Sequence, residues 1–203
     1  MTTDQQPAAA EAAPGHDSGA ADLDGESDQP PAGGADGLFD REAVDGLHVV
    51  GLDESGFAGL DVDRWCGIAE RALEGEGVAG GRLDLVFVDL DAMADLNTEH
   101  MGHEGPTDVL AFPLDGPAAL DGSADDAPPL HLGDVIVCPQ RAADQAPDHA
   151  GSLDAELTLL VVHGVLHVLG HDHAEPAERL AMQARERWHL ARDGINHPVP
   201  VSG

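Results

Sequence analysis

The chain has 203 residues, which is enough for one well-formed hydrophobic core and too few for two large domains. It carries 39 acidic residues against nine basic ones, for a formal net charge of −30, the opposite of the basic balance typical of nucleic-acid-binding proteins. The two cysteines form no CxxC motif, no apolar run reaches the roughly 18 residues of a membrane span, and no signal peptide is evident. We therefore expect a cytoplasmic protein with reduced thiols and no membrane partner.

Residues 1–42 differ in composition from the rest of the chain. They are rich in Ala, Gly, Pro, Asp and Gln, and residues 1–40 hold nine acidic residues and no arginine. Because this stretch has few large apolar side chains, it cannot bury enough surface to offset the conformational entropy lost on ordering. We predict a disordered acidic extension over residues 1–42, followed by a folded domain over residues 43–203.

Hydrophobic periodicity predicts strands and helices that alternate along the first half of this domain. Alternating apolar residues indicate strands, whereas apolar residues three or four apart indicate helices with one buried face. Glycine and proline mark the ends of several of these segments. In chain order we expect a strand at 47–52, a helix at 62–74, a strand at 83–88, a helix at 91–99, a loop at 100–107 and a strand at 108–112.

The second half continues this alternation around a long apolar helix. Residues 115–129 are acidic and rich in Gly, Pro and Ala, so we expect either a hairpin-like connection or a flexible insertion. The elements expected after it are a strand at 132–138, a short helix at 139–146, a central helix from Gly151 or Ser152, and a final helix at 176–192. This order implies a single compact α/β (α+β) domain in which the central helix packs on the sheet.

The final helix is predicted to start at Pro176, because proline is favoured at the first position of a helix. Its apolar residues recur with the spacing of one helix face. We predict that a buried stripe consists mostly of Ala177, Leu180, Ala181, Ala184, Trp188 and Leu190. This face would pack the helix on the rest of the domain.

Histidines at the end of the central helix have the spacing of metal ligands. His163 and His167 lie four residues apart, on one face of a helix, where two imidazoles can reach one metal ion. His173 can join them only if the chain reverses, and Gly170 stands where this reversal is needed. The alternative is that these histidines are buried core residues, but clustered neutral imidazoles would then need other partners. We therefore predict a three-histidine zinc site with an open fourth position.

The residues next to this motif leave several roles open. His171 is a candidate fourth ligand, a substrate contact or a turn residue, and we favour the last two. Asp172 is a candidate acceptor that orients a ligand imidazole, or alternatively a plain turn residue. Gly164 follows the first histidine where the zinc proteases with an H-E-x-x-H helix have a glutamate general base. A metallopeptidase is therefore the weaker interpretation.

Three blocks of the sequence together resemble the YbeY family. The first is His163-Gly-x-Leu-His167-x-x-Gly170-x-Asp172-His173, the second is Leu96-Asn97 followed by Pro106 to Pro113, and the third runs from Leu132 to Val137. The blocks follow the family's order and cover roughly residues 82–175. The family comprises single-domain, metal-dependent endoribonucleases of bacteria, implicated in ribosomal RNA maturation and ribosome quality control.

The resemblance implies a small mixed β-sheet covered by helices, with the metal in a cleft beside it. It implies a single-strand-specific endoribonuclease that matures the 3′ end of 16S ribosomal RNA. One zinc ion per chain suits three imidazoles best, although nickel or copper would also bind. The implied partners are ribosomal RNA and the small ribosomal subunit, with no DNA. The alternatives are a ribosome-assembly factor with a mainly structural metal, and a zinc metallopeptidase.

The resemblance also points to residues that contact RNA, and the sequence departs from the family pattern at Met101, Ala111 and His171. Met101 stands where many members have an arginine thought to contact the phosphate backbone. Methionine cannot neutralise a phosphate, so His103 and Arg141 are the candidate substitutes. The full set of candidate substrate-binding residues is His103, Thr107, Asp108, Arg141 and His171.

Overall fold

The computed structural model describes residues 46–114 and 130–198. The extension predicted over residues 1–42 and the two alternatives for residues 115–129 lie outside the described residues. The elements occur in the predicted order, with ends that differ by a few residues. They are β1 Leu47–Asp53, α1 Val62–Gly75, β2 Gly81–Phe87, α2 Leu90–Met101, β3 Val109–Pro113, β4 His131–Val137, α3 Pro139–Gln145, η2 Ala146–Asp148, α4 Leu153–Val168 and α5 Pro176–Arg192.

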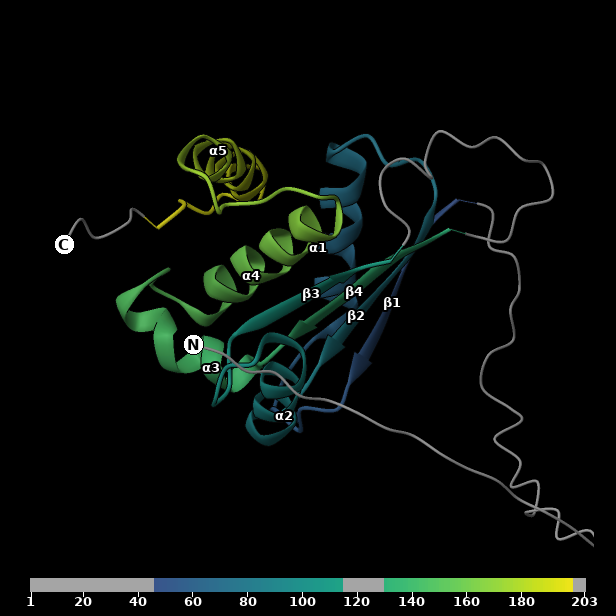
Figure 1. Ribbon diagram of the computed structural model, residues 1–203. Coiled ribbons are helices and arrows are strands. Elements are labelled where there is room, and N and C mark those ends of the chain that lie inside the picture. Colours follow the sequence, from purple (N-terminus) through teal and green to yellow (C-terminus); the bar gives the residue numbers. More distant parts are fainter. Residues whose placement is uncertain (1–45, 115–129, 199–203) are drawn as a thin grey trace, which may run out of the picture. The chain divides into compact units, whose positions relative to one another are not determined.

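The four strands form one mixed sheet in the order β1-β2-β4-β3 (Figure 1). β1 pairs parallel to β2, and β2 pairs parallel to β4, whereas β3 runs antiparallel to β4 at the edge. The α1 crossover places β1 and β2 side by side in parallel, as a helix between two strands commonly does. The predicted α/β domain with a small mixed sheet is confirmed.

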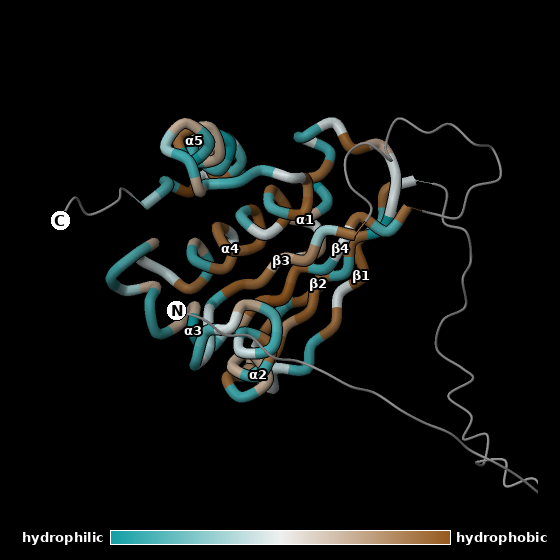
Figure 2. Tube along the Cα trace, viewed as in Figure 1, coloured by the Kyte–Doolittle hydropathy of each residue, from teal (hydrophilic) through white to brown (hydrophobic). Residues whose placement is uncertain are grey.

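Helices cover both faces of this sheet. On one face, α1 and α4 enclose the larger core, which includes Trp65, Leu85 and Val161. On the other face α2 closes a smaller cluster around Met93 and Leu110. The strands carry much of the brown in Figure 2, because they supply apolar side chains to both clusters.

The central helix α4 is buried almost all round and packs against β3 and β4. Gly164 brings it close to the sheet, because a Cβ at this position would lie 2.5 Å from Cγ1 of Val135. Among the described residues, no single helix is both long and apolar enough to cross a membrane; the pair formed by Pro139–Asp148 and Leu153–Val168 passes on length and composition only when taken together across a 116° bend.

The prediction for the buried stripe of α5 is wrong for all but one of its residues. Of the predicted positions only Leu190 is buried, whereas Leu180 is 64% exposed and Trp188 is 44% exposed. The residues that α5 buries are Met182, Glu186, His189 and Leu190. The helix packs against α4 rather than on the sheet, and two of its buried side chains are polar groups that bind partners on other elements.

Candidate metal centre

The turn after α4 brings the third histidine of the motif back to the first two. The helix ends at Val168, and Gly170 has a φ of 88°, the left-handed conformation predicted for it. The N–H of Gly170 donates to the carbonyl of His167 at 2.9 Å, and the N–H of His171 donates to Leu166 at 3.0 Å. These bonds satisfy carbonyls of the last helical turn, so the reversal is a stable helix end.

The three imidazoles converge as the spacing predicts. Nε2 of His163 lies 3.1 Å from Nε2 of His167, and one ring nitrogen from each of His163, His167 and His173 lies within 4.8 Å of the other two. Nitrogens bound 2.0–2.1 Å from one tetrahedral ion stand about 3.3 Å apart. The three side chains therefore fit a single metal ion, and no fourth His, Cys, Asp or Glu joins this group within the described part of the chain.

A carboxylate on α5 orients the first imidazole, and the sequence analysis did not find it. Oε1 of Glu186 accepts a hydrogen bond from Nδ1 of His163 at 2.7 Å, which leaves Nε2 facing the other two histidines. Oε2 of Glu186 accepts from Nε2 of His197 at 2.8 Å. Burial alone would raise the pKa of Glu186, but the hydrogen bonds and charges of the two histidines outweigh it and lower the pKa.

One signal in the sequence could have revealed Glu186. It lies four residues after Met182 and four before Leu190, on the same helix face as two apolar residues. An acid in the middle of a buried stripe needs a partner, and histidines are the partners available here.

The middle histidine of the group is held in the form that binds metals. Burial, together with the nearby charges of His163 and His173, lowers the pKa of His167 to about 4. At neutral pH its imidazole is therefore uncharged, and a neutral ring nitrogen is the ligand that a transition metal requires.

Asp172 and His171 lie beside the group but do not bind its imidazoles. Oδ1 of Asp172 accepts from the backbone N–H of His173 at 2.6 Å and of Ala174 at 3.2 Å, which lowers the pKa of the carboxyl. This geometry favours the turn role over the orienting role, which Glu186 performs instead. Nε2 of His171 lies 3.6 Å from Oε2 of Glu76 at the end of α1, and His171 is not part of the three-histidine group.

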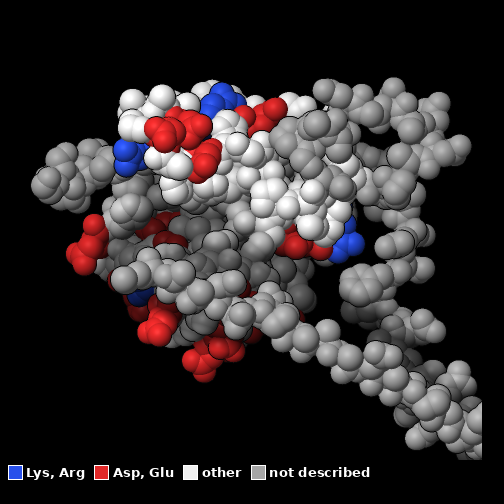
Figure 3. Space-filling view, in the orientation of Figure 1, with Lys and Arg blue, Asp and Glu red and all other residues white. Residues whose placement is uncertain are grey.

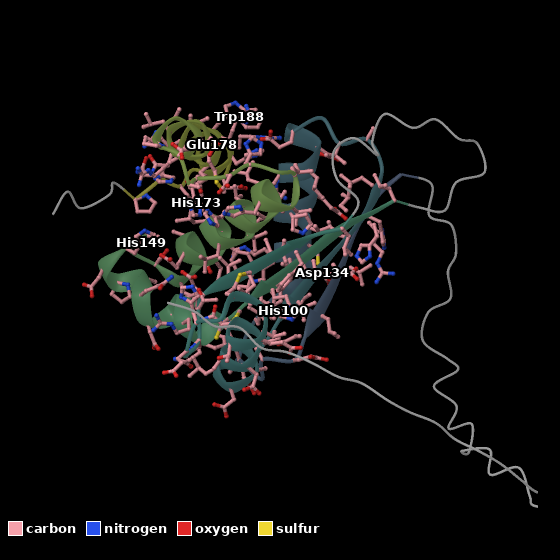
Figure 4. All side chains as sticks on the ribbon, in the orientation of Figure 1. His100, Asp134, His149, His173, Glu178 and Trp188 are labelled. Atoms are coloured by element: carbon pink, nitrogen blue, oxygen red, sulfur yellow. The ribbon has the colours of Figure 1, made fainter. Side chains whose placement is uncertain are left out.

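Two cavities adjoin the histidines and share Asp108 and Val109 as well as His163 and His173. One has a volume of about 340 Å³ and is lined mainly by α4 and α5. The other, of about 510 Å³, is lined by the end of α2, the loop after it and β3. Figure 4 shows His173 between α4 and α5. The candidate metal group therefore faces open space on two sides.

The structure brings three of the five candidate substrate-binding residues to the larger cavity. His103, Thr107 and Asp108 line it, and Met101 lies beside them. The hydroxyl of Thr107 donates to Oδ1 of Asp108 at 3.1 Å. Arg141, on α3, is among the lining residues of neither cavity, and His171 also lies outside both.

A buried carboxylate forms the far wall of the smaller cavity. Glu156 is fully buried in the first turn of α4. Its oxygens accept from Nε2 of Gln145 at 2.9 Å, from Nδ1 of His149 and from the N–H of Ala150. Gln145 also donates to Asp108 at 2.7 Å, so the network reaches both cavities. No spacing in the sequence indicates these contacts.

The fold and the site together define an α/β domain with a candidate three-histidine metal centre open to two cavities. The family described as Endoribonuclease YbeY matches residues 61–194, which is most of the described chain. The protein therefore belongs to the YbeY family, and the resemblance carried by the three sequence blocks is confirmed.

Two relatives of the same description agree with this assignment. The Endoribonuclease YbeY of Salinispora tropica is 48% identical over 143 residues, which cover 66% of this chain and 89% of the relative. The Endoribonuclease YbeY of Frankia casuarinae is 44% identical over 145 residues, or 70% of each chain. The solution structure of TM1509 from Thermotoga maritima matches with a TM-score of 0.47 and 22% identity, covering 76% of this chain and 99% of that one.

Proposed function

We propose that this protein is a zinc-dependent endoribonuclease that cleaves single-stranded ribosomal RNA. It would act in the cytoplasm on the small ribosomal subunit, in maturation of the 16S 3′ end and in ribosome quality control. The observation that carries the proposal is the convergence of His163, His167 and His173 beside two cavities in a chain of the YbeY family. The relatives named Endoribonuclease YbeY support the RNA substrate.

The donor set favours zinc over other ions. Three neutral imidazoles suit zinc, and a site with three protein ligands leaves a coordination position for water or substrate. Zinc held there would supply a Lewis acid and make water a stronger nucleophile near neutral pH. The protein's own part is to orient His163 through Glu186 and to keep His167 uncharged.

Two alternatives from the sequence analysis find less support. A structural zinc site would have four protein ligands, but His171 faces Glu76 instead of the group. A metallopeptidase would need a general base at position 164, where the side chain would meet Val135 of the sheet.

The test is cleavage of ribosomal RNA by the zinc-loaded protein, compared with His167→Ala and with protein treated with a chelator. Of these three samples, we expect cleavage only by the unsubstituted protein without chelator. His48→Ala is the matched control, because this exposed histidine on β1 is remote from the site and should keep full activity. A folded, zinc-loaded protein that leaves RNA intact would contradict the proposal, and cleavage of peptides instead would favour the metallopeptidase.

A further inference from the structure

The cavity between α4 and α5 has a charge balance that is unfavourable for an RNA strand. Asp108, Glu156 and Glu186 line it, all of them acids. RNA carries one negative charge per phosphate, so a strand that enters needs a cation to offset these carboxylates. The metal would offset part of this charge at the histidines. A second cation is needed where the neighbouring phosphates lie.

Arg179 can supply this second positive charge. Within the described ranges, it is the one basic side chain, apart from histidines, among the lining residues of either cavity. It stands in the first turn of α5, which begins three residues after His173. The same helix face continues into the cavity through Gln183, one turn further on.

Four of the other arginines that the structure describes already form ion pairs with acidic side chains. Arg64 pairs with Asp154 at 2.9 Å, and Arg185 pairs with Glu76 at 2.7 Å. Arg71 and Arg82 also form ion pairs. Arg179 is exposed and has no ion pair within the part of the chain that the structure describes. Its guanidinium is therefore available to an anionic ligand.

The stability of α5 does not account for an arginine at this position. The first turn of a helix carries the positive end of the dipole, where a cation is unfavourable and an acid is favourable. The acid in this turn, Glu178, is already engaged, because its Oε2 accepts from the backbone N–H of Glu175 in a capping box. Figure 3 shows basic and acidic groups interleaved over α5, so the positive charge there is local rather than a broad patch.

We propose that Arg179 binds a phosphate of the RNA strand at the rim of this cavity and so positions the strand against the three histidines. This inference rests on the proposed function and names the contact that the site makes with its substrate. The planar guanidinium can donate two parallel hydrogen bonds to one phosphate, and its charge is permanent at physiological pH. Arg179 is thus a substrate-binding residue, with no part in the chemical step.

The experiment compares Arg179→Gln with Arg64→Gln in the full-length, zinc-loaded protein. Each substitution removes one positive charge, but Arg64 pairs with Asp154 on the surface and lines neither cavity. Steady-state cleavage of a single-stranded RNA gives KM and kcat. Fluorescence anisotropy with a labelled 2′-O-methyl RNA of the same sequence, measured at several salt concentrations, gives Kd. Circular dichroism checks that all variants are folded.

We expect Arg179→Gln to raise KM and Kd roughly tenfold, as loss of a hydrogen bond to a charged group does, and to leave kcat near its original value. The slope of log Kd against log salt should fall by about 0.7, the value for one phosphate contact on a single strand. Arg179→Lys should recover part of the affinity, because lysine keeps the positive charge but lacks the planar guanidinium that donates two parallel hydrogen bonds. Arg64→Gln should behave like the unsubstituted protein.

Equal changes in the two glutamine variants would overturn this inference, since the effect would then come from net charge alone. A fall in kcat at unchanged KM would overturn it too, because Arg179 would act in the chemical step. If the unsubstituted protein neither binds nor cleaves RNA, the proposed function fails as well. If it cleaves RNA and Arg179→Gln does so equally, only the inference about Arg179 fails.

Discussion

Both ring nitrogens of His163 have a partner, and these partners fix the orientation of the imidazole in the site. One ring nitrogen faces His167 at 3.1 Å, and the other donates to Glu186 at 2.7 Å. A carboxylate behind a ligand imidazole fixes the ring's orientation and raises its basicity, so its loss affects metal affinity more than folding. Glu186 also binds His197, which ties the chain after α5 to the same carboxylate.

Replacement of Glu186 by glutamine should weaken zinc binding by about 10- to 100-fold, because the amide keeps the shape but loses the charge. Competitive zinc titration with a chromophoric chelator measures the change. Glu178→Gln is the matched control, since it removes a charge from the same helix and glutamine also serves in a capping box. Equal zinc affinity in both variants would show that Glu186 does not orient a ligand.

At the scale of the elements, the position of α4 depends on a close approach to the sheet, and α5 is attached through polar contacts. Gly164 lies where a Cβ would come within 2.5 Å of the buried Val135. Glu76 at the end of α1 accepts hydrogen bonds from Arg185 at 2.8 Å and His189 at 2.6 Å, both on α5. These contacts hold the two helices that carry the histidines and Glu186.

Gly164→Ala should therefore destabilise the protein by about 1–3 kcal/mol, because valine is stiff and the core leaves no room for the added carbon. Chemical denaturation measures the free energy of unfolding. The control is Gly67→Ala in α1, where a Cβ would meet only the end of Arg71 at 3.4 Å. There, alanine should be neutral or stabilising, by up to about 1 kcal/mol. A Gly164→Ala variant as stable as the original would refute the close packing.

The contribution of Glu76, which joins α1 to α5, to the free energy of unfolding should depend on pH. Burial alone would raise the pKa of Glu76, but the hydrogen bonds and charges of His189 and Arg185 outweigh it, and the pKa falls below its ordinary value of 4.5. A carboxyl with a lowered pKa stabilises the fold above its unfolded pKa, and that contribution is lost as pH falls through the folded pKa. Glu76→Gln should cost about 1–2 kcal/mol at pH 7.

The measurement is the free energy of unfolding of both proteins at a series of pH values. The gap between the two free energies should narrow as the pH falls below 4.5, the ordinary pKa of glutamate. A gap that stays constant into the acid range would mean that the charge of Glu76 does not contribute.

At the scale of the whole molecule, a chain with a net charge of −30 folds around a cluster of three histidines, of which His167 is uncharged at neutral pH. Binding of a cation there should stabilise the native state, since the unfolded chain lacks the assembled site. With free zinc at 100 times Kd, the free energy of unfolding should rise by about 2.7 kcal/mol. Thermal melts with zinc and then with excess chelator should show a reversible shift, which His173→Ala should lose. A zinc-independent melting temperature would contradict the metal site.

How much could be predicted from the sequence differs between the helix motif and its surroundings. The spacing of His163, His167 and His173, with Gly170 between them, predicts their convergence, because helix geometry and the glycine turn are local. The order and type of the strands and helices likewise follow from periodicity and end signals. These features depend on residues within one or two turns of each other.

Only the tertiary structure decided what faces the histidines. Glu186 lies 23 residues from His163, and the network of Glu156 joins α4 to α3 and to the residues that follow η2. The error in the buried face of α5 has the same cause: that face was chosen for its apolar residues alone, whereas the helix buries the polar Glu186 and His189 together with Met182 and Leu190. Which face a helix buries depends on the partners that the fold brings to it, and pairing over such distances leaves no period in the sequence.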